Sequence, residues 1–277
     1  MAFAYSRGIR LIPSGVVVLV DVMVVMSDMS AIIVTVVRDW AMYDELVRTN
    51  KFCEGAVFAP LDNSVANLPV PVRYNSFLES YDYSHDAWFV FCHEDFEFLE
   101  NISEVAKNFD VNALYGPIGH IRVGLLGFGV QRVRGEILAT RKGESHWQSW
   151  KTGRHLTKPA RVETFDCCCL MVHSSLVKRL GLRFDEKLEF DMYVEDFCAS
   201  AYERYNVLSY AFQMKVCHHS DSPASDRLWR HLPYLADKYK SHFYTGTLAY
   251  FGTPSWQKRL QDCLVAFVRR LFLKGND

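Results

Sequence analysis

The sequence lacks the features that mark several simple classes of protein. Its 31 lysines and arginines are matched by 32 aspartates and glutamates, so the net charge of -1 offers no global excess of positive charge for nucleic acid. No Cys-x-x-Cys pair occurs among the eight cysteines, which argues against a structural zinc knuckle. An apolar run from Val16 to Met26 is interrupted by Asp21 and is shorter than the about 20 residues of a membrane helix. These absences favour a cytoplasmic protein with reduced, mostly buried thiols.

The chain contains enough apolar material for a large core. Hydrophobic residues make up 49% and aromatic residues 14% of its 277 residues, which argues against disorder. Apolar strands alternate with helical stretches in the first half. Strands are expected at Ala31–Val37, Gly55–Ala59, Ala87–Cys92 and Val111–Tyr115, and helices at Trp40–Asn50, Val72–Tyr81 and Phe98–Phe109. This alternation predicts an α/β fold with a mostly parallel sheet, whose binding sites lie beyond the carboxyl ends of the strands.

The second half of the chain is less regular. Residues 117–161 are rich in Gly, Arg and Trp and predict irregular strands with a mobile loop. Strands are expected at Val162–Val172 and Val207–Val216, and helices at Asp191–Tyr205, Asp226–Phe243 and Ser255–Phe272. We therefore expect a main domain over residues 30–222 and a helical appendix over 223–277. Residues 1–29 are either an extension outside the fold or an added edge strand.

Three polar clusters carry the chemical signals. His93, Glu94 and Asp95 directly follow the buried strand Ala87–Cys92, where they suit either a Mg²⁺ or Mn²⁺ site or a helix N-terminus. Glu195 and Asp196 lie on an amphipathic helix, where paired acids are usually a solvated face. His218 and His219 end the last strand of the main domain and can complete a metal site or simply lie in a loop.

Together these clusters resemble a known family. The chain resembles glycosyltransferases of the GT-A fold, in the broad group of the inverting cellulose and chitin synthases, and more narrowly bacterial glycosyltransferase-like proteins with an FxHxD-type segment. That segment reads Phe91-Cys92-His93-Glu94-Asp95. Further matching segments are Leu114–Gly119, Phe165-Asp166, Phe184-Asp185-Glu186, Tyr193–Cys198 and Val216–His218, so the resemblance covers about residues 30–222.

The resemblance implies a role for individual residues. Asp95 and His218 would bind the metal, Mn²⁺ or Mg²⁺, and His93 stands where the family has its first acid. Asp196 would be the catalytic base, with Glu195 beside it. The nucleotide-sugar donor would contact Thr35, Val37, Asp62, Asn75 and Glu94. The acceptor would contact Asp166 and a loop that carries Trp147 and Trp150, although the two tryptophans suit a loop packed on the core at least as well.

The implied reaction is metal-dependent transfer of a sugar, with inversion, from a nucleotide sugar to a saccharide or lipid-linked acceptor, a UDP-sugar being favoured. Two alternatives remain open. One is a non-catalytic nucleotide-sugar-binding protein, because His93 departs from the acidic pattern, and the other is a metal-dependent phosphoesterase that uses Asp95, His218 and His219. The stretch Ser255–Phe272 carries basic residues beside an apolar face, which suits either packing on the domain or peripheral contact with the inner face of a membrane.

Overall fold

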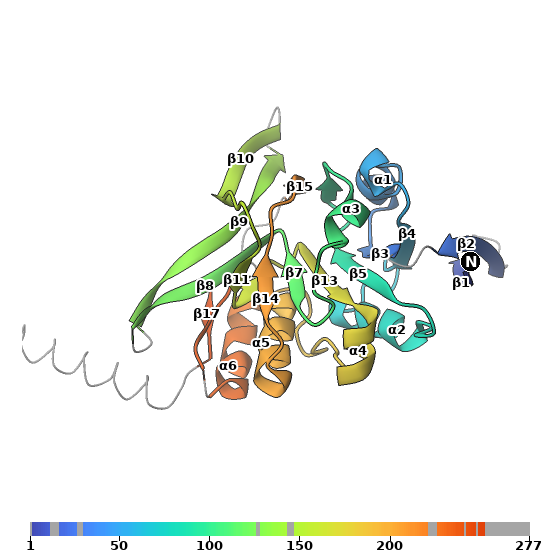
Figure 1. The fold of residues 1–277 in the computed structure, drawn as a ribbon. Coiled ribbons are helices and arrows are strands. Elements are labelled where there is room, and N and C mark those ends of the chain that lie inside the picture. The colour runs from blue at the N-terminus through green and yellow to red at the C-terminus, as the bar shows by residue number, and fades with distance from the viewer. Residues whose placement is uncertain are drawn as a thin grey trace, which may run out of the picture.

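A seven-stranded mixed sheet forms the centre of the computed structural model, which describes residues 2–11, 17–26, 30–125, 128–142, 147–220, 226–240, 242–247 and 249–252 (Figure 1). The strand order is β11-β14-β7-β13-β5-β3-β4. The strands are β3 (Ser30–Val37), β4 (Val57–Asp62), β5 (Ala87–Cys92), β7 (Leu114–Gly116), β11 (Ala160–Val162), β13 (Cys169–His173) and β14 (Ser209–Ala211). Strands β3, β4, β5, β7 and β14 share one direction, whereas β13 and β11 run against their neighbours.

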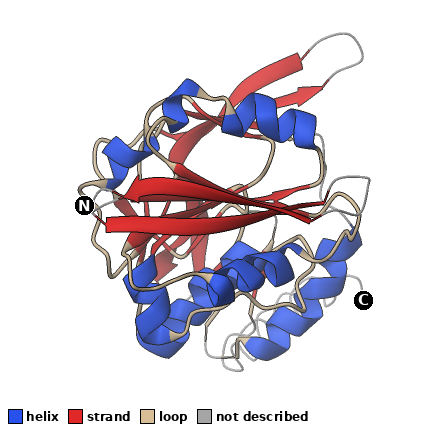
Figure 2. Ribbon diagram, turned by 90° about the vertical axis from the view of Figure 1, so that its right-hand side faces the viewer, coloured by secondary structure: helices blue, strands red, loops and turns tan. Residues whose placement is uncertain are grey.

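Helices cover both faces of this sheet (Figure 2). They are α1 (Trp40–Tyr43), continued by η1 (Asp44–Arg48) and η2 (Lys51–Cys53), then α2 (Val70–Ser80), α3 (Ile102–Ala106), α4 (Ser174–Leu180), α5 (Tyr193–Tyr205) and α6 (Asp226–Lys238). Strand β5 shows why its sequence is apolar throughout. Phe89 and Phe91 face the core beneath α2 and α5, while Trp88 and Val90 face the core beneath η1 and α3. Both faces of the strand are thus buried, as the unbroken apolar run predicts.

A second sheet lies beside the first, and the hairpin formed by its strands β9 and β10 projects from the molecule (Figure 1). Its order is β12-β8-β9-β15-β6, with β10 paired to β9. The strands are β6 (Phe96–Phe98), β8 (Ile118–Leu125), β9 (Phe128–Lys142), β10 (Trp147–Arg154), β12 (Thr164–Phe165) and β15 (Val216–His219). Gly135 and Gly153 have φ angles of +85° and +99°, and a Cβ at Gly135 would lie 2.0 Å from the carbonyl oxygen of Pro117. Only glycine allows these segments to approach so closely.

The mixed α/β class predicted from the sequence is confirmed, but several elements differ. The expected irregular stretch 117–161 is mostly the strands β8, β9 and β10. The expected strand Val162–Val172 is divided among β11, β12 and β13 because Asp166 accepts a hydrogen bond from Cys168 N (3.0 Å) and turns the chain between two sheets. The expected strand Val207–Val216 is likewise divided between β14 and β15. The expected helix Phe98–Phe109 is shortened to α3 because Phe98 ends strand β6.

The two ends of the chain are built differently. Strands β1 (Ala2–Leu11) and β2 (Val17–Met26) pair with each other in a separate two-stranded sheet, so β2 adds no edge to the central sheet. Helix α6 and the hairpin of β16 (Tyr244–Thr245) and β17 (Tyr250–Phe251) contribute to the same core as α2 and α5. The expected helix Ser255–Phe272 lies outside the described residues. Within the described ranges, no helix has both the length and the apolar character needed to cross a membrane.

Candidate metal centre

Two segments far apart in the sequence meet where β5 ends. His93 and Asp95 follow β5 directly, and His218 lies on β15. Strand β15 pairs antiparallel with β6, which places His218 opposite Phe96, and His219 N donates a hydrogen bond to the carbonyl oxygen of Asp95 (2.9 Å). The backbone pairing therefore fixes the distance between the two segments before any side chain is considered.

Three ligand atoms converge at this junction. The Nε2 atom of His218 lies 3.4 Å from Oδ1 of Asp95, and Nδ1 of His93 lies 3.8 Å from the same oxygen. All three ligand atoms are within 4.8 Å of one another. Asp95 Oδ1 and His218 Nε2 are both buried, and they pair with each other when His218 is protonated. A cation bound between the three ligand atoms would take the place of the proton that joins His218 to Asp95.

The hydrogen bonds around His93 fix which ring nitrogen carries its proton. Tyr193 donates its hydroxyl proton to the carbonyl oxygen of Cys167 (3.0 Å), and the same hydroxyl lies 2.9 Å from His93 Nε2. Because the single proton of Tyr193 is already used, the hydroxyl must accept from His93 Nε2–H. The neutral ring then turns the bare lone pair of Nδ1 toward the Asp95 carboxylate. Two lone pairs facing each other are repulsive unless a cation lies between them.

The electrostatics of the cluster agree with this arrangement. Burial lowers the pKa of His93, which keeps the ring neutral and able to act as a ligand. Burial alone would raise the pKa of Asp95, but the neighbouring His218 and His93 lower it overall. The pKa of His218 is raised overall because Asp95 and Asp166 outweigh the effect of burial. The cluster thus offers a carboxylate and the neutral ring of His93, whereas His218 must lose the proton that Asp95 favours before its Nε2 can bind a cation.

Asp166, which the resemblance assigns to the acceptor, joins this cluster. One of its carboxylate oxygens lies within 4.8 Å of a His218 nitrogen and of the Cys168 sulfur. Burial would raise its pKa, but the charge of His218 lowers it overall. Two imidazoles with one or two carboxylates suit Mn²⁺ better than Mg²⁺, which prefers oxygen ligands alone. The residues present therefore fit a divalent transition metal.

Glu195 and Asp196 lie side by side on α5 but in different surroundings. The Cys167 thiol donates to Glu195 Oε2 (2.9 Å), and burial raises the pKa of Glu195 from 4.5 to about 7. Asp196 is 1% exposed, and its carboxylate accepts from Lys238 Nζ (2.9 Å) and from the Tyr239 hydroxyl (2.7 Å). Asp196 thus joins α5 to α6, whereas Glu195 faces the Cys167 segment that also orients Tyr193.

Three of the five residues expected to bind the donor have side chains that are buried or hydrogen-bonded within the protein. The side chains of Thr35 and Val37 are completely buried in β3. Asn75 donates to the carbonyl oxygen of Phe184 and accepts from its N–H, both at 2.9 Å, so its amide joins α2 to the segment before α5. Their side chains therefore have no group facing a ligand.

The other two lie where β3 and β4 end. Glu94 accepts from the backbone N–H groups of Arg38 (2.6 Å) and Asp39 (2.8 Å), which ties the end of β5 to the end of β3. Asp62 ends β4 and accepts from Trp40 Nε1 (3.3 Å). The indole of Trp40 is 37% exposed beside this carboxylate. This pair offers a ring face and an acceptor at the carboxyl end of parallel strands.

The two tryptophans expected on an acceptor loop lie instead on strand β10. Trp147 pairs with Lys142 and Trp150 with Ala139 of β9, so both belong to the projecting hairpin. The Trp150 side chain is 44% exposed. The Trp147 side chain lies outside what the structure describes. The loop prediction failed because the Gly and Lys residues of this stretch suggested irregular chain where a two-stranded ribbon forms.

Sequence reasoning missed Tyr193, Cys167 and Phe190. Tyr193 and Cys167 orient His93, and the ring of Phe190 stacks on the imidazole of His93 with centroids 5.3 Å apart. A signal for Tyr193 was present, since it begins the same helix as Glu195. Nothing in the sequence marks a backbone carbonyl such as that of Cys167 as an orienting group.

In a neighbouring cluster of possible metal ligands, hydrogen bonds already occupy the ring nitrogens of the histidine. Glu97, Cys217 and His219 also bring ligand atoms within 4.8 Å of one another. His219 Nε2 lies 2.9 Å from Glu97 Oε2, and its Nδ1 lies 2.9 Å from the hydroxyl of Thr140. Both ring nitrogens are therefore satisfied. A second ion beside the first would have to break these bonds.

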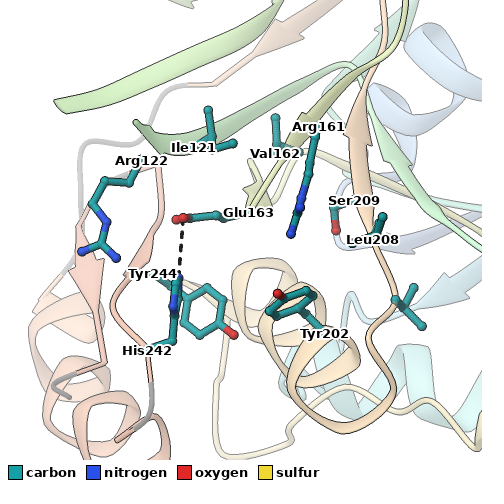
Figure 3. A pocket seen from close by; sticks show the side chains of 11 residues that line it. Ile121, Arg122, Arg161, Val162, Glu163, Tyr202, Leu208, Ser209, His242 and Tyr244 are labelled. Atoms are coloured by element: carbon teal, nitrogen blue, oxygen red, sulfur yellow. Dashed lines mark ion pairs between the residues drawn. The ribbon is translucent and has the colours of Figure 1, made fainter. Parts of the chain in front are cut away.

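A separate cavity of about 200 Å³ lies at the outer edge of the central sheet, between β8, β11, α5 and β16 (Figure 3). Arg161 points into it and its guanidinium lies 5.6 Å from the centre of the Tyr202 ring. On the opposite wall Glu163 pairs with His242 (3.6 Å) and accepts from Thr245 N (3.1 Å). Its charged groups thus include both signs.

Comparison with known proteins leaves the family open. No family model matches the sequence, and no curated protein matches it. Among solved structures, the chain is similar to the crystal structure of A197 from STIV, with 13% identity and a TM-score of 0.37. The match covers 71% of this chain and 97% of the other. A likeness of this degree carries no argument about activity, which must be argued from the site itself.

Proposed function

We propose that the protein is a metal-dependent glycosyltransferase that takes a nucleotide-sugar donor, with a UDP-sugar favoured. The observation that carries the proposal is the convergence of His93 Nδ1, Asp95 Oδ1 and His218 Nε2 at the end of β5, where the latter two atoms are buried. The cluster follows β5, close to the carboxyl ends of parallel strands, where nucleotide ligands bind in open α/β sheets. Mn²⁺ bound there would stabilise the negative charge that develops on a departing diphosphate.

The donor nucleotide is placed next to the same sheet edge. Trp40 offers a partly exposed ring face for the base, and Asp62 offers a carboxylate for a ribose hydroxyl or a base N–H. The hydrogen bonds of Ser64 to Asp62 lower the pKa of this carboxyl against the opposing effect of burial, so it is charged at neutral pH. Glu94 shapes this edge by holding Arg38 and Asp39 rather than by touching the donor.

Of the two acids on α5, Glu195 suits the base of an inverting transfer better than Asp196. A base works best when its pKa is close to the working pH, and burial gives Glu195 a pKa of about 7. Among the described residues, its Oε1 is held by a long bond from Thr247 N (3.4 Å), a contact that is easily exchanged for an acceptor hydroxyl. Asp196 would have to leave both Lys238 and Tyr239. Glu195 would take the proton of the acceptor hydroxyl on the face opposite the departing diphosphate.

Transfer is favoured over the phosphoesterase alternative by the closed neighbouring cluster. A two-metal hydrolase needs ligand atoms free to hold a second ion about 3.5–4 Å from the first. His219 and Glu97 are instead bonded to each other, and His219 is also bonded to Thr140. The described residues therefore offer one open metal position.

The test measures metal and nucleotide binding by calorimetry, followed by a transfer assay. We expect Mn²⁺ to bind the wild-type protein and UDP to bind only when Mn²⁺ is present. Asp95→Asn should abolish both, whereas Glu97→Gln, a matched change in the neighbouring cluster, should leave both unchanged. Equal UDP affinity with and without EDTA would contradict the proposal. Release of UDP with no glycosylated product from a panel of acceptors would instead favour hydrolysis.

A further inference from the structure

A second, more open hollow of about 450 Å³ is lined by basic side chains. It lies between β8, β9 and the segment that leads from β10 to β11. Arg134 contributes from β9, His155 and Lys158 from the connecting segment, and Arg161 from β11. No aspartate or glutamate lines it. In a protein whose net charge is only -1, this is a local excess of positive charge.

The basic side chains of this hollow have no acidic partners in the part of the chain that the structure describes. No ion pair joins Arg134, Lys158 or Arg161 to a described carboxylate, whereas Arg48, Lys107 and Lys151 on the surface are each paired with one. The Nε–H of Arg134 is buried and makes no hydrogen bond to a described residue. The adjoining cavity of Figure 3 differs because Glu163 lies in its wall.

The hollow is built on rigid parts of the fold. Gly135 follows Arg134, and the close approach of Gly153 to the carbonyl oxygen of Gly135 brings the connecting segment against β9. That segment is then fixed by a hydrogen bond from Leu156 N to the side chain of Gln213 (3.0 Å). Arg161 is held against the ring of Tyr202. The backbone that carries these side chains is thus held in place, which favours a specific site over a diffuse patch.

We propose that this hollow is a binding site for a small organic anion, whose phosphate or carboxylate group contacts Arg134 and Lys158 and comes near Arg161, which also lines the cavity of Figure 3. Guanidinium groups bind such oxygens through paired, charge-assisted hydrogen bonds. The volume suits a ligand of about one sugar unit with its anionic group. The site shares no residue with the metal centre, and the proposal does not depend on the transfer reaction.

The experiment uses calorimetry on the full chain in EDTA, so that the metal centre does not hold phosphate. The probes are inorganic phosphate, glucose 6-phosphate and glucuronate, which distinguish a phosphate ligand from a carboxylate ligand. We expect at least one to bind, with affinity that falls as NaCl is raised from 0.05 to 0.5 M. Arg134→Gln, Arg161→Gln and Lys158→Gln should each weaken binding by about tenfold.

Arg179→Gln provides the matched control, since Arg179 lies on α4 and is bonded to Asn112. It should leave binding unchanged. Asp95→Asn should also leave it unchanged, which separates this site from the metal centre. The proposal is overturned if none of the three probes binds, or if Lys158→Gln and Arg161→Gln both bind as tightly as the wild type. Lys158 is exposed, so its replacement does not threaten folding.

Discussion

Replacing Glu195 by glutamine should separate stability from activity. Burial raises the pKa of Glu195 from 4.5 to about 7, so the folded protein holds this proton more tightly than the unfolded chain does. The resulting stabilisation is fully present below pH 4.5 and is lost as the pH rises through about 7. At about 1.4 kcal/mol per pKa unit, the loss amounts to about 3 kcal/mol.

Glutamine has almost the same size and is neutral at every pH. Glu195→Gln should therefore match the wild type in stability near pH 4.5 and exceed it by up to about 3 kcal/mol at pH 8. Urea unfolding of both proteins across this range measures the difference. Every other titrating group is common to the two proteins, so the pH dependence of the difference isolates Glu195. The transfer rate should fall by about 10²–10⁴-fold, the usual contribution of a general base.

Two results would refute this reasoning. A difference in unfolding free energy that does not change with pH would show that Glu195 does not titrate between 4.5 and 7. A variant that keeps more than a third of the wild-type transfer rate would show that Glu195 is not the base. In the wild type, the transfer rate should rise with pH and level off above about 7, because the base must be deprotonated to accept a proton.

Three further predictions concern the framework. Asp196→Asn removes one of the two carboxylates that pair with Lys238, but burial raises the pKa of Asp196, so the neutral side chain offsets part of that loss and the free energy of unfolding should fall by no more than about 1 kcal/mol. The transfer rate should stay within threefold, and a rate loss above 100-fold would return the base to Asp196. Gly135→Ala should lower the free energy of unfolding by at least about 3 kcal/mol, because the new Cβ overlaps neighbouring atoms and the backbone is strained. In the same urea titration, Gly55→Ala should lower it by about 1 kcal/mol, since Gly55 also has a positive φ (+83°) but open space around it. A chain that starts at Met29 should melt cooperatively at the wild-type temperature, because β1 pairs only with β2; loss of the cooperative melt would show that this sheet supports the core.

The sequence predicted those parts of the fold that local pattern determines. Strand β5 was expected at Ala87–Cys92 and is found there, because a strand buried on both faces is apolar at every position. The break at Asp166 was not predicted, since it depends on a turn closed by Cys168 N and on pairing with β8 in another sheet. Pairing between distant segments leaves little trace in local composition.

In the candidate site, too, local pattern predicted some features, whereas others depend on pairing between distant segments. His93, Asp95 and His218 were identified because each lies at the end of an apolar strand, and such ends meet at one edge of the structure. The different surroundings of Glu195 and Asp196 could not be predicted, because they depend on which residues α6 and the Cys167 segment bring against neighbouring positions of one helix. Adjacent helix positions point about 100° apart, so one acid can be an ion-pair partner while the next remains a proton acceptor.

The first turn of α5 links cation binding at His93 to protonation of Glu195. Cys167 contacts both the metal cluster and the acid through different atoms. Its carbonyl oxygen accepts a hydrogen bond from the Tyr193 hydroxyl, which orients His93, and its thiol donates a hydrogen bond to Glu195. A cation that binds at His93 and tightens this chain of bonds also changes the field at Glu195. Linkage then requires the reverse, so that deprotonation of Glu195 alters the affinity for the cation by the same factor. Metal concentration and pH would then act on the same equilibrium, each shifting the midpoint of the other's titration.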